Sequence, residues 1–509
     1  MKLASLVAAV FVAVAATAAV GQPALARHGR DERTTIGRAD WPTYGHDAQR
    51  TFTGETTLTP RSVATLARAW SFPTGLAVTA TPTVVGGTVY VGSWDGNFYA
   101  LNLRTGTLRW KYRLDAQPAV QPAPGGPPES GSSGGIVTSS AWFEPGTRTH
   151  PDLVLFGGGY TLYALDARTG ALYWKHAYPG RPDQAPDPVH DDARIFSSPV
   201  VDGGIVIVGI AVEGARGSRG RIVAADLATG KPRWEFVTDV DAAGNPLSDG
   251  CGSVWSSGSL LPADHLVVFD VADCHFSGPG PFDESVFALD TGGGRLRWVF
   301  HPPRRDNSCD FDFGASANIG VDGSGRARFV GVGGKDGTYY RLDPRTGHLV
   351  WSTNVVFGGF AGGFVATTAY DGKRVYGATA LGDFGRFERN GPTVCDPSNP
   401  RDTPFQEPSV HALDARTGAV EYEASGGASF GPTTVARDMT FNCPALQPNV
   451  NIRDARTGTL LRRLDLPVPC WSGIATVGDA LVLGTGASYN DVGSGVSVFT
   501  PGGAPPAGS

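Results

Sequence analysis

Short apolar runs alternate with polar turns along almost the whole chain, and the alternation repeats. Runs such as Thr88–Gly92 and Leu153–Gly157 lead to a turn rich in Asp, Thr and Gly, followed by a segment that carries an aromatic residue. The fullest copy is Leu165-Asp-Ala-Arg-Thr-Gly170 with Trp174. Its relatives are Leu101–Gly106 with Trp110, Ala225–Gly230 with Trp234, Leu289–Gly292 with Trp298, Leu342–Gly347 with Trp351, Leu413–Gly418 with Tyr422, and Arg453–Gly458. Internal repetition of this kind indicates a repeat architecture.

Each repeat has the pattern of a small antiparallel sheet. The apolar run and the aromatic segment predict two strands joined by a turn, and further short strands are expected upstream, as at Phe196–Pro199 and Val365–Thr368. A four-stranded sheet cannot bury both faces alone, so the units must stack radially, with the aromatic residue of each docking on its neighbour. The pattern predicts an all-β fold, an eight-bladed β-propeller of four-stranded blades over residues 41–500. The strand that carries Trp70 is expected to complete the last blade and close the ring.

Composition agrees with this fold and excludes some functions. The chain has 509 residues with 70 Gly and 38 Pro, which suits a loop-rich β protein. Its formal charge is −6, so nothing resembles a basic face for nucleic acid.

The first residues resemble a secretory signal. Lys2 precedes an apolar run from Leu3 to Val20, and Ala24-Leu25-Ala26 then forms a small-x-small cleavage site, so residues 1–26 are predicted to be a cleaved signal peptide. The alternative is an uncleaved membrane anchor, because the run is long enough to span a bilayer. Cleavage would leave a secreted, extracytoplasmic protein with no stable membrane span. Residues 27–40 are expected to be flexible and residues 501–509 a disordered tail.

The six cysteines suggest disulfides in an oxidising compartment. Proximity along the chain favours Cys443 with Cys470 and Cys251 with Cys274, although six cysteines permit fifteen pairings. No Cys-x-x-Cys-His sequence occurs, so a covalently attached haem is not expected.

The repeat resembles that of the pyrroloquinoline quinone (PQQ) dehydrogenase propellers. The opening Trp41–Asp47 is similar to the start of secreted members, and the stretch 251–343 resembles the polyvinyl-alcohol-dehydrogenase branch. In that stretch Val254–Ser257, Asp310–Ser316 and Val332–Asp343 stand in the family's order. The resemblance covers about residues 41–500, but non-enzymatic scaffolds such as the outer-membrane assembly lipoproteins share the repeat.

The resemblance implies a cofactor site on the propeller axis. Trp255 would stack on the quinone, Lys335 would contact it, and Asp310 would be the catalytic base. Glu213 and Asp273 follow equivalent strands of successive blades, and with Asp310 they would bind Ca²⁺ through carboxylate oxygens. The plainer alternatives are ordinary packing for Trp255, a surface hairpin for Lys335 and solvent-exposed loops for the three carboxylates.

Several positions depart from the family pattern. The usual Gly-Thr-Gly-Asn run is replaced by Asp270-Val-Ala-Asp273, and Cys309 stands where Trp commonly precedes the catalytic Asp. No adjacent cysteine pair exists to cover the quinone. The side chains at residues 270–272 are larger than glycine and are expected to take up space in the cofactor slot.

Two functions follow from these observations. The first is a secreted quinoprotein dehydrogenase that oxidises an alcohol, secondary or polymeric, with PQQ and Ca²⁺, and passes electrons to a separate acceptor such as a cytochrome c. The second is a non-catalytic propeller that binds a partner and has a degenerate cofactor site.

Overall fold

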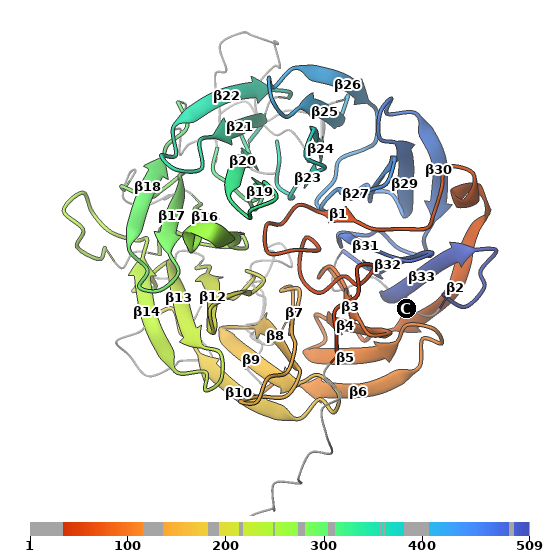
Figure 1. Cartoon of the computed structure of the whole chain (residues 1–509), viewed down its shortest axis with the longest axis horizontal. Coiled ribbons are helices and arrows are strands. Elements are labelled where there is room, and N and C mark those ends of the chain that lie inside the picture. The colour runs from red at the N-terminus through yellow and green to blue at the C-terminus, as the bar shows by residue number, and fades with distance from the viewer. Residues whose placement is uncertain are drawn as a thin grey trace, which may run out of the picture.

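The computed structural model describes residues 34–115, 136–181, 193–212, 217–247, 250–272, 280–303, 311–356, 358–359, 362–380, 407–487 and 493–507. Eight sheets of antiparallel strands stand side by side in a ring (Figure 1). The predicted eight-bladed β-propeller is therefore confirmed. The predicted signal peptide at residues 1–26 lies outside the described residues.

The first four blades follow one another in sequence, each with its innermost strand first. Blade 1 contains β3 (Thr83–Val85), β4 (Thr88–Gly92), β5 (Asn97–Asn102) and β6 (Leu108–Arg113). Blade 2 contains β7 (Trp142–Glu144), β8 (Leu153–Gly158), β9 (Thr161–Asp166) and β10 (Leu172–Ala177). Blade 3 contains β11 (Val200–Asp202), β12 (Ile205–Ile210), β13 (Arg221–Asp226) and β14 (Pro232–Val237). Blade 4 contains β15 (Ser259–Leu261), β16 (Leu266–Asp270), β17 (Val286–Asp290) and β18 (Leu296–Phe300), with the 3-10 turn η3 (Pro262–Asp264).

The other four blades complete the ring. Blade 5 contains β19 (Asn318–Val321), β20 (Ala327–Gly333), β21 (Thr338–Leu342) and β22 (Leu349–Asn354). Blade 6 contains β23 (Ala369–Tyr370), β24 (Arg374–Ala378), β25 (Val410–Asp414) and β26 (Val420–Ala424). Blade 7 contains β27 (Thr434–Ala436), β28 (Met439–Asn442), β29 (Asn449–Asp454) and β30 (Leu460–Asp465), and the short β1 (Thr53–Gly54) joins its inner edge. Blade 8 contains β31 (Ile474–Val477), β32 (Ala480–Thr485), β33 (Gly495–Pro501) and, after the turn η1 (Ser62–Thr65), the N-terminal β2 (Leu66–Pro73).

Strand β2 closes the ring as expected. It pairs with β33 along its length, with Trp70 opposite Val498. Because the first long strand of the chain thus completes the last blade, the two ends of the propeller are held together by backbone hydrogen bonds.

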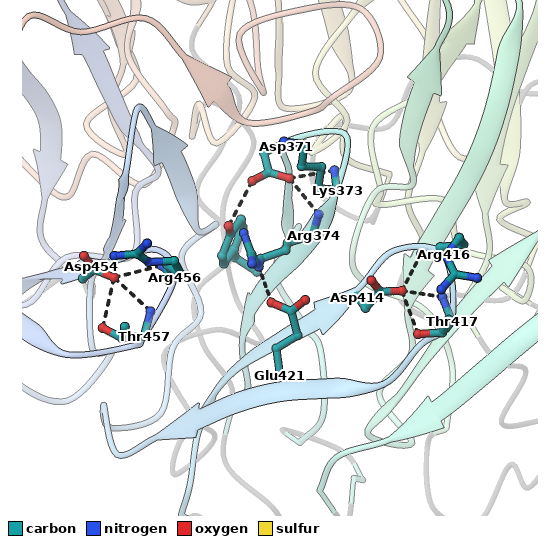
Figure 2. A network of polar contacts seen from close by, with 11 residues as sticks. Asp371, Lys373, Arg374, Asp414, Arg416, Thr417, Glu421, Asp454, Arg456 and Thr457 are labelled. Atoms are coloured by element: carbon teal, nitrogen blue, oxygen red, sulfur yellow. Dashed lines mark hydrogen bonds and ion pairs between the residues drawn. The ribbon is translucent and has the colours of Figure 1, made fainter.

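The repeated Asp forms a polar turn between the last two strands of a blade. In blade 6, Oδ1 of Asp414 accepts hydrogen bonds from the backbone N–H of Arg416 and from the N–H and hydroxyl of Thr417, both at 2.7 Å (Figure 2). Asp454 makes the same three contacts in blade 7. The Thr417 hydroxyl, with the backbone N–H groups, lowers the pKa of the Asp414 carboxyl.

The aromatic residue of the preceding blade packs against the Gly of the same turn. Trp110 of blade 1 lies over Gly170 of blade 2, and its indole N–H donates to the Ala167 carbonyl at 3.0 Å. Trp70, Trp174, Trp234, Trp298 and Trp351 donate in the same way to the next blade. The aromatic residues therefore latch each blade to its neighbour, as predicted.

Replacing Gly170 by Ala is expected to destabilise this junction. A Cβ there would lie 2.5 Å from the Trp110 ring, and the φ of +72° is strained for any side chain. We expect the free energy of unfolding to fall by about 2–4 kcal/mol in denaturant titrations. Gly203→Ala is the matched control, since its φ is +56° but nothing lies within 4 Å of a Cβ, so only the backbone cost of about 1–2 kcal/mol should appear. Equal losses in the two variants would contradict the latch.

Two predicted strands lie elsewhere. The expected strands at Phe196–Pro199 and Val365–Thr368 are wrong, because the innermost strands begin only at Val200 and Ala369. The preceding residues do not belong to the sheet, because the chain bends at Ser197 and at Ala366. Trp255 likewise lies outside the ladder, four residues before β15.

The C-terminal boundary also differs from the prediction. Residues 501–507 were expected to belong to a disordered tail, but β33 ends at Pro501 and the Gly502 N–H donates to the Thr65 carbonyl at 2.8 Å. The N–H of Ala507 donates to Asp479. These bonds hold the segment against blade 8.

An inner segment, residues 41–57, runs around the inside of the ring, where its red trace crosses the centre of Figure 1. Its carbonyls accept N–H groups from the innermost strands, including Phe143 at Pro42, Leu260 at Ala48, Ile319 at Gln49, Tyr370 at Thr51 and Val435 at Phe52. Trp41 pairs with Val84 and Thr57 donates to Gly478, so blades 1 and 8 are bound too. This role of residues 41–57 was not predicted from the sequence.

One of the proposed disulfides is confirmed. Cys443 and Cys470 are bonded across blades 7 and 8. Cys251 is also disulfide-bonded, but its suggested partner Cys274 lies outside the described residues. In the part of the chain that the structure describes, no helix has both the length and the apolar character to cross a membrane.

Candidate functional site

A cavity of about 420 Å³ lies on the axis of the propeller. Every blade contributes to its wall, from the residues that lead into the innermost strands, and Tyr44 of the inner segment adds to it. Its volume falls within the range of small-molecule sites.

The wall has two tiers, which lie on either side of a bend before each innermost strand. In the first tier, each residue stands four positions before an innermost strand, and most of these side chains are apolar, including Phe196, Trp255 and Phe430. In the second tier, which we term the hydroxyl tier, each residue stands two positions before an innermost strand. It comprises Thr81, Ser140, Ser198, Ser257 and Ser316. The cavity thus has one aromatic level and one level of hydroxyl groups.

Trp255 is the aromatic residue that the sequence singled out, and it borders the cavity. It is half-buried, and Gly314 of blade 5 makes room for its ring: a Cβ at Gly314 would lie 2.4 Å from the indole. The indole is therefore fixed in place by the neighbouring blade and presents a flat apolar surface.

Lys335 lies over the same indole. Its ammonium nitrogen is 5.9 Å from the Trp255 ring centroid and forms an ion pair with Oδ1 of Asp312 at 3.0 Å. The exposed fractions of the two side chains are only 7% and 3%. The lysine N–H also donates to the Asp312 carbonyl at 2.8 Å, so backbone and side chain hold the pair together. Lys335 is thus not a surface hairpin lysine.

A second buried carboxyl belongs to Asp270 at the end of β16. Its side chain is 1% exposed, and neither oxygen has a hydrogen-bond partner of good geometry among the described residues. Burial raises the pKa of this carboxyl well above its usual range; the Ser256 hydroxyl lowers it and the charge of Asp312 adds to the rise. Asp270 therefore favours its protonated form.

Asp270→Asn is expected to stabilise the protein at neutral pH and remove a pH dependence. A carboxyl whose pKa is raised by folding stabilises the fold fully below its unfolded pKa, and this contribution is lost as pH rises toward the folded pKa. The wild type should thus weaken from about pH 4 upward, whereas Asn carries no charge. Melting temperatures of both proteins in EDTA from pH 4.5 to 7.5 test this. A wild-type curve parallel to that of the variant would contradict it.

Of the five predicted site residues, the structure places two. Trp255 and Lys335, 80 residues apart in sequence, come together beside the cavity. Glu213, Asp273 and Asp310 lie outside the described residues, so the predicted metal ligands stay predictions. Within the described ranges no group of three or more His, Cys, Asp or Glu side chains could hold a metal ion.

Arg50 binds the backbone of Ser198, a residue that lines the cavity, and this role was not predicted from the sequence. The residue is fully buried, and its guanidinium donates to the carbonyls of Gly258, Pro199, Ser198 and Tyr44 and to the Thr43 hydroxyl. Burial lowers the pKa of Arg50 to about 10, so the group remains charged at neutral pH. In the sequence, Arg50 follows Gln49 in a polar stretch, and nothing there distinguishes it from a surface arginine.

Residues 41–356 match the family model described as "PQQ: Glucose/ethanol/alcohol dehydrogenase, beta-propeller domain". A polyvinylalcohol dehydrogenase from a Sphingopyxis species is 25% identical over 384 residues, which are 69% of this chain and 54% of that protein. The chain spans about half the length of the curated relatives it matches.

Solved structures share the fold over most of the chain. A europium-containing methanol dehydrogenase superposes with a TM-score of 0.72 at 18% identity, covering 91% of this chain and 98% of that one. The quinohemoprotein alcohol dehydrogenase of Comamonas testosteroni gives 0.71 at 20% identity, covering 92% and 81%. At these identities the likeness establishes the fold alone.

Proposed function

Because the chain belongs to the PQQ family of alcohol dehydrogenase β-propellers, we propose that it oxidises an alcohol with bound PQQ and passes the electrons to a separate acceptor. The observation that carries the proposal is the axial cavity, bordered by an indole over which a buried lysine is held. A flat apolar ring and a cation side by side suit a planar, electron-accepting ligand.

The described residues fit such a cofactor. The volume of about 420 Å³ is sufficient for a molecule of a few fused rings, and Asp270 does not fill the slot. When bound, PQQ would accept hydride from the alcohol carbon. Trp255 would hold its plane, and Lys335, kept in place by Asp312, would supply positive charge near a carbonyl oxygen.

The metal and the base belong to the proposal as well. Glu213, Asp273 and Asp310 would supply carboxylate oxygens to Ca²⁺, which prefers such ligands. Asp310 would take the proton of the alcohol hydroxyl. The relatives named polyvinylalcohol dehydrogenases suggest a secondary or polymeric alcohol, and a cytochrome c suits the role of acceptor. With the predicted signal peptide, the reaction would take place outside the cytoplasm.

A non-catalytic binding propeller is the second candidate. It is favoured by the cavity wall, in which none of the described lining residues is charged. It is also favoured by Asp270, which introduces a buried carboxyl where the family has a small residue. A ligand other than the quinone would then occupy the cavity.

Dye reduction separates the two candidates. The protein is incubated with PQQ and Ca²⁺ and assayed with primary alcohols, secondary alcohols and polyvinyl alcohol. We expect turnover, which Asp310→Asn should lower by about 10²–10⁴-fold, the usual contribution of a general base. No turnover with any alcohol would exclude the dehydrogenase, and an unchanged rate in the variant would exclude Asp310 as the base.

A further inference from the structure

One face of the propeller, which we term the turn face, carries the turns between the third and fourth strands of blades 1–7. Backbone hydrogen bonds join these turns to those between the first and second strands, as from Leu103 to Gly87 and from Ala415 to Lys373. The residues that line the axial cavity precede the innermost strands, so they lie at the other end of the blades. A partner bound to the turn face would therefore leave the cavity uncovered.

Exposed arginines occupy the same position of this turn in five blades. Each follows the repeated Asp or Asn by two residues, and Figure 2 shows the turns of blades 6 and 7. They lie in blades 5, 6, 7, 1 and 2, interrupted only by blade 8 (Figure 1). Among the described residues none of these guanidinium groups forms an ion pair. We term this set the arginine arc: Arg104, Arg168, Arg345, Arg416 and Arg456.

The charge balance of blades 3 and 4, which lie outside the arc, is different. There Arg233 forms an ion pair with Asp226, and Arg295 forms one with Asp290 at 3.0 Å. Within the arc, the repeated carboxylates are half-buried and are held by the N–H groups and the Thr hydroxyl of their own turn, as at Asp414. The guanidinium groups are thus the exposed charges of the arc.

The turn of blade 1 carries two arginines without a carboxylate partner. Asn102 stands where other blades have the repeated Asp, and Arg109, at the position of Arg233 in blade 3, donates to a backbone carbonyl at 3.1 Å instead. A cleft of about 160 Å³ lies here, lined by Asn102, Arg104 and Arg109 and by Pro506 and Ala507 of the C-terminal segment. It suits a phosphate group, because guanidinium groups donate charge-assisted hydrogen bonds to phosphate oxygens.

The arc also exposes apolar side chains. In four of its blades a leucine lies two residues after the turn glycine, with an exposed fraction between 40% and 45%. Cations beside exposed leucines match a bilayer interface, where anionic headgroups border the acyl chains. A soluble polyanion would offer nothing apolar to these side chains, which are Leu108, Leu172, Leu349 and Leu460.

We propose that the arginine arc docks the propeller on an anionic lipid bilayer, with a lipid phosphate group in the cleft of blade 1. Because equivalent turns repeat around one face of a ring, the five guanidinium groups reach a flat surface together. Loss of one arginine should lower partitioning onto the bilayer about fivefold, which corresponds to about 1 kcal/mol. The proposal needs no quinone and no turnover, so it stands apart from the dehydrogenase assay.

Sedimentation of the full chain with lipid vesicles tests the docking. Vesicles of phosphatidylcholine and phosphatidylglycerol in equal parts are compared with vesicles of phosphatidylcholine alone, at low and at high salt. We expect the wild type to bind the anionic vesicles more tightly than the neutral ones and to be released from them by salt. An apolar N-terminal segment would bind both kinds of vesicle alike, so the difference between the two lipids reports the arc.

Charge variants locate the contact. Arg104→Gln/Arg109→Gln should bind anionic vesicles at least about tenfold more weakly than the wild type. The matched control is Arg233→Gln/Arg295→Gln, which removes the same formal charge outside the arc and should lower binding by less than about threefold. All four residues are exposed, so the fold should be unaffected. Equal binding to the two kinds of vesicle would overturn the proposal, as would equal losses in the two variants or binding to soluble polyphosphate but to neither vesicle.

Discussion

Arg50→Ala is expected to lower the free energy of unfolding by at least about 3 kcal/mol, because four buried acceptors and one partly buried acceptor lose their donor together. The guanidinium joins the inner segment to blade 3, and in blade 4 it adds to the backbone bond between Leu260 and Ala48. Its loss should therefore loosen the inner segment as well as the cavity. Unfolding in guanidinium chloride, followed by tryptophan fluorescence, measures the change in the free energy of unfolding.

Arg168→Ala is the control for this prediction. Arg168 is an exposed residue of a turn, so its removal should change stability by less than about 0.5 kcal/mol. A similar small effect at Arg50 would mean that the inner segment does not depend on its guanidinium.

Lys335→Met is expected to destabilise the protein by about 3–5 kcal/mol, because it leaves the carboxylate of Asp312 buried without its ammonium partner. Replacing both charges removes the penalty, so Lys335→Met/Asp312→Asn should recover much of the loss. A double-mutant cycle measured by chemical denaturation gives the coupling. If the double variant is no more stable than Lys335→Met, the ion pair is not what holds the lysine over Trp255.

The ring could be predicted because its signal is local and repeated. Each aromatic latch needs a glycine in the next turn, as Trp110 needs Gly170, and both appear in the sequence at fixed spacing. The strand starts were misplaced at Phe196 and Val365 because the bent residues before each innermost strand have the same composition as a short strand. Ser198 and Val365 line the cavity, and only the three-dimensional arrangement reveals this.

The site could be predicted only in part. Trp255 and Lys335 were identified from a resemblance, whereas their proximity depends on blades 4 and 5 being adjacent. Asp312, two residues from Asp310, was overlooked since either acid fits the same motif. The role of Arg50 could not be predicted, because its partners are mainly backbone carbonyls, which every residue has and which therefore leave no pattern in the sequence.

We propose that the axial cavity binds a quinone against the indole of Trp255. Calorimetric titration of PQQ into the wild type and into Trp255→Ala, both with Ca²⁺, tests it most directly. We predict one-to-one binding by the wild type at micromolar affinity or tighter, about −8 kcal/mol. Loss of the stacking surface should weaken it by about 10–100-fold. An absence of binding heat, or equal affinities of the two proteins, would contradict the claim.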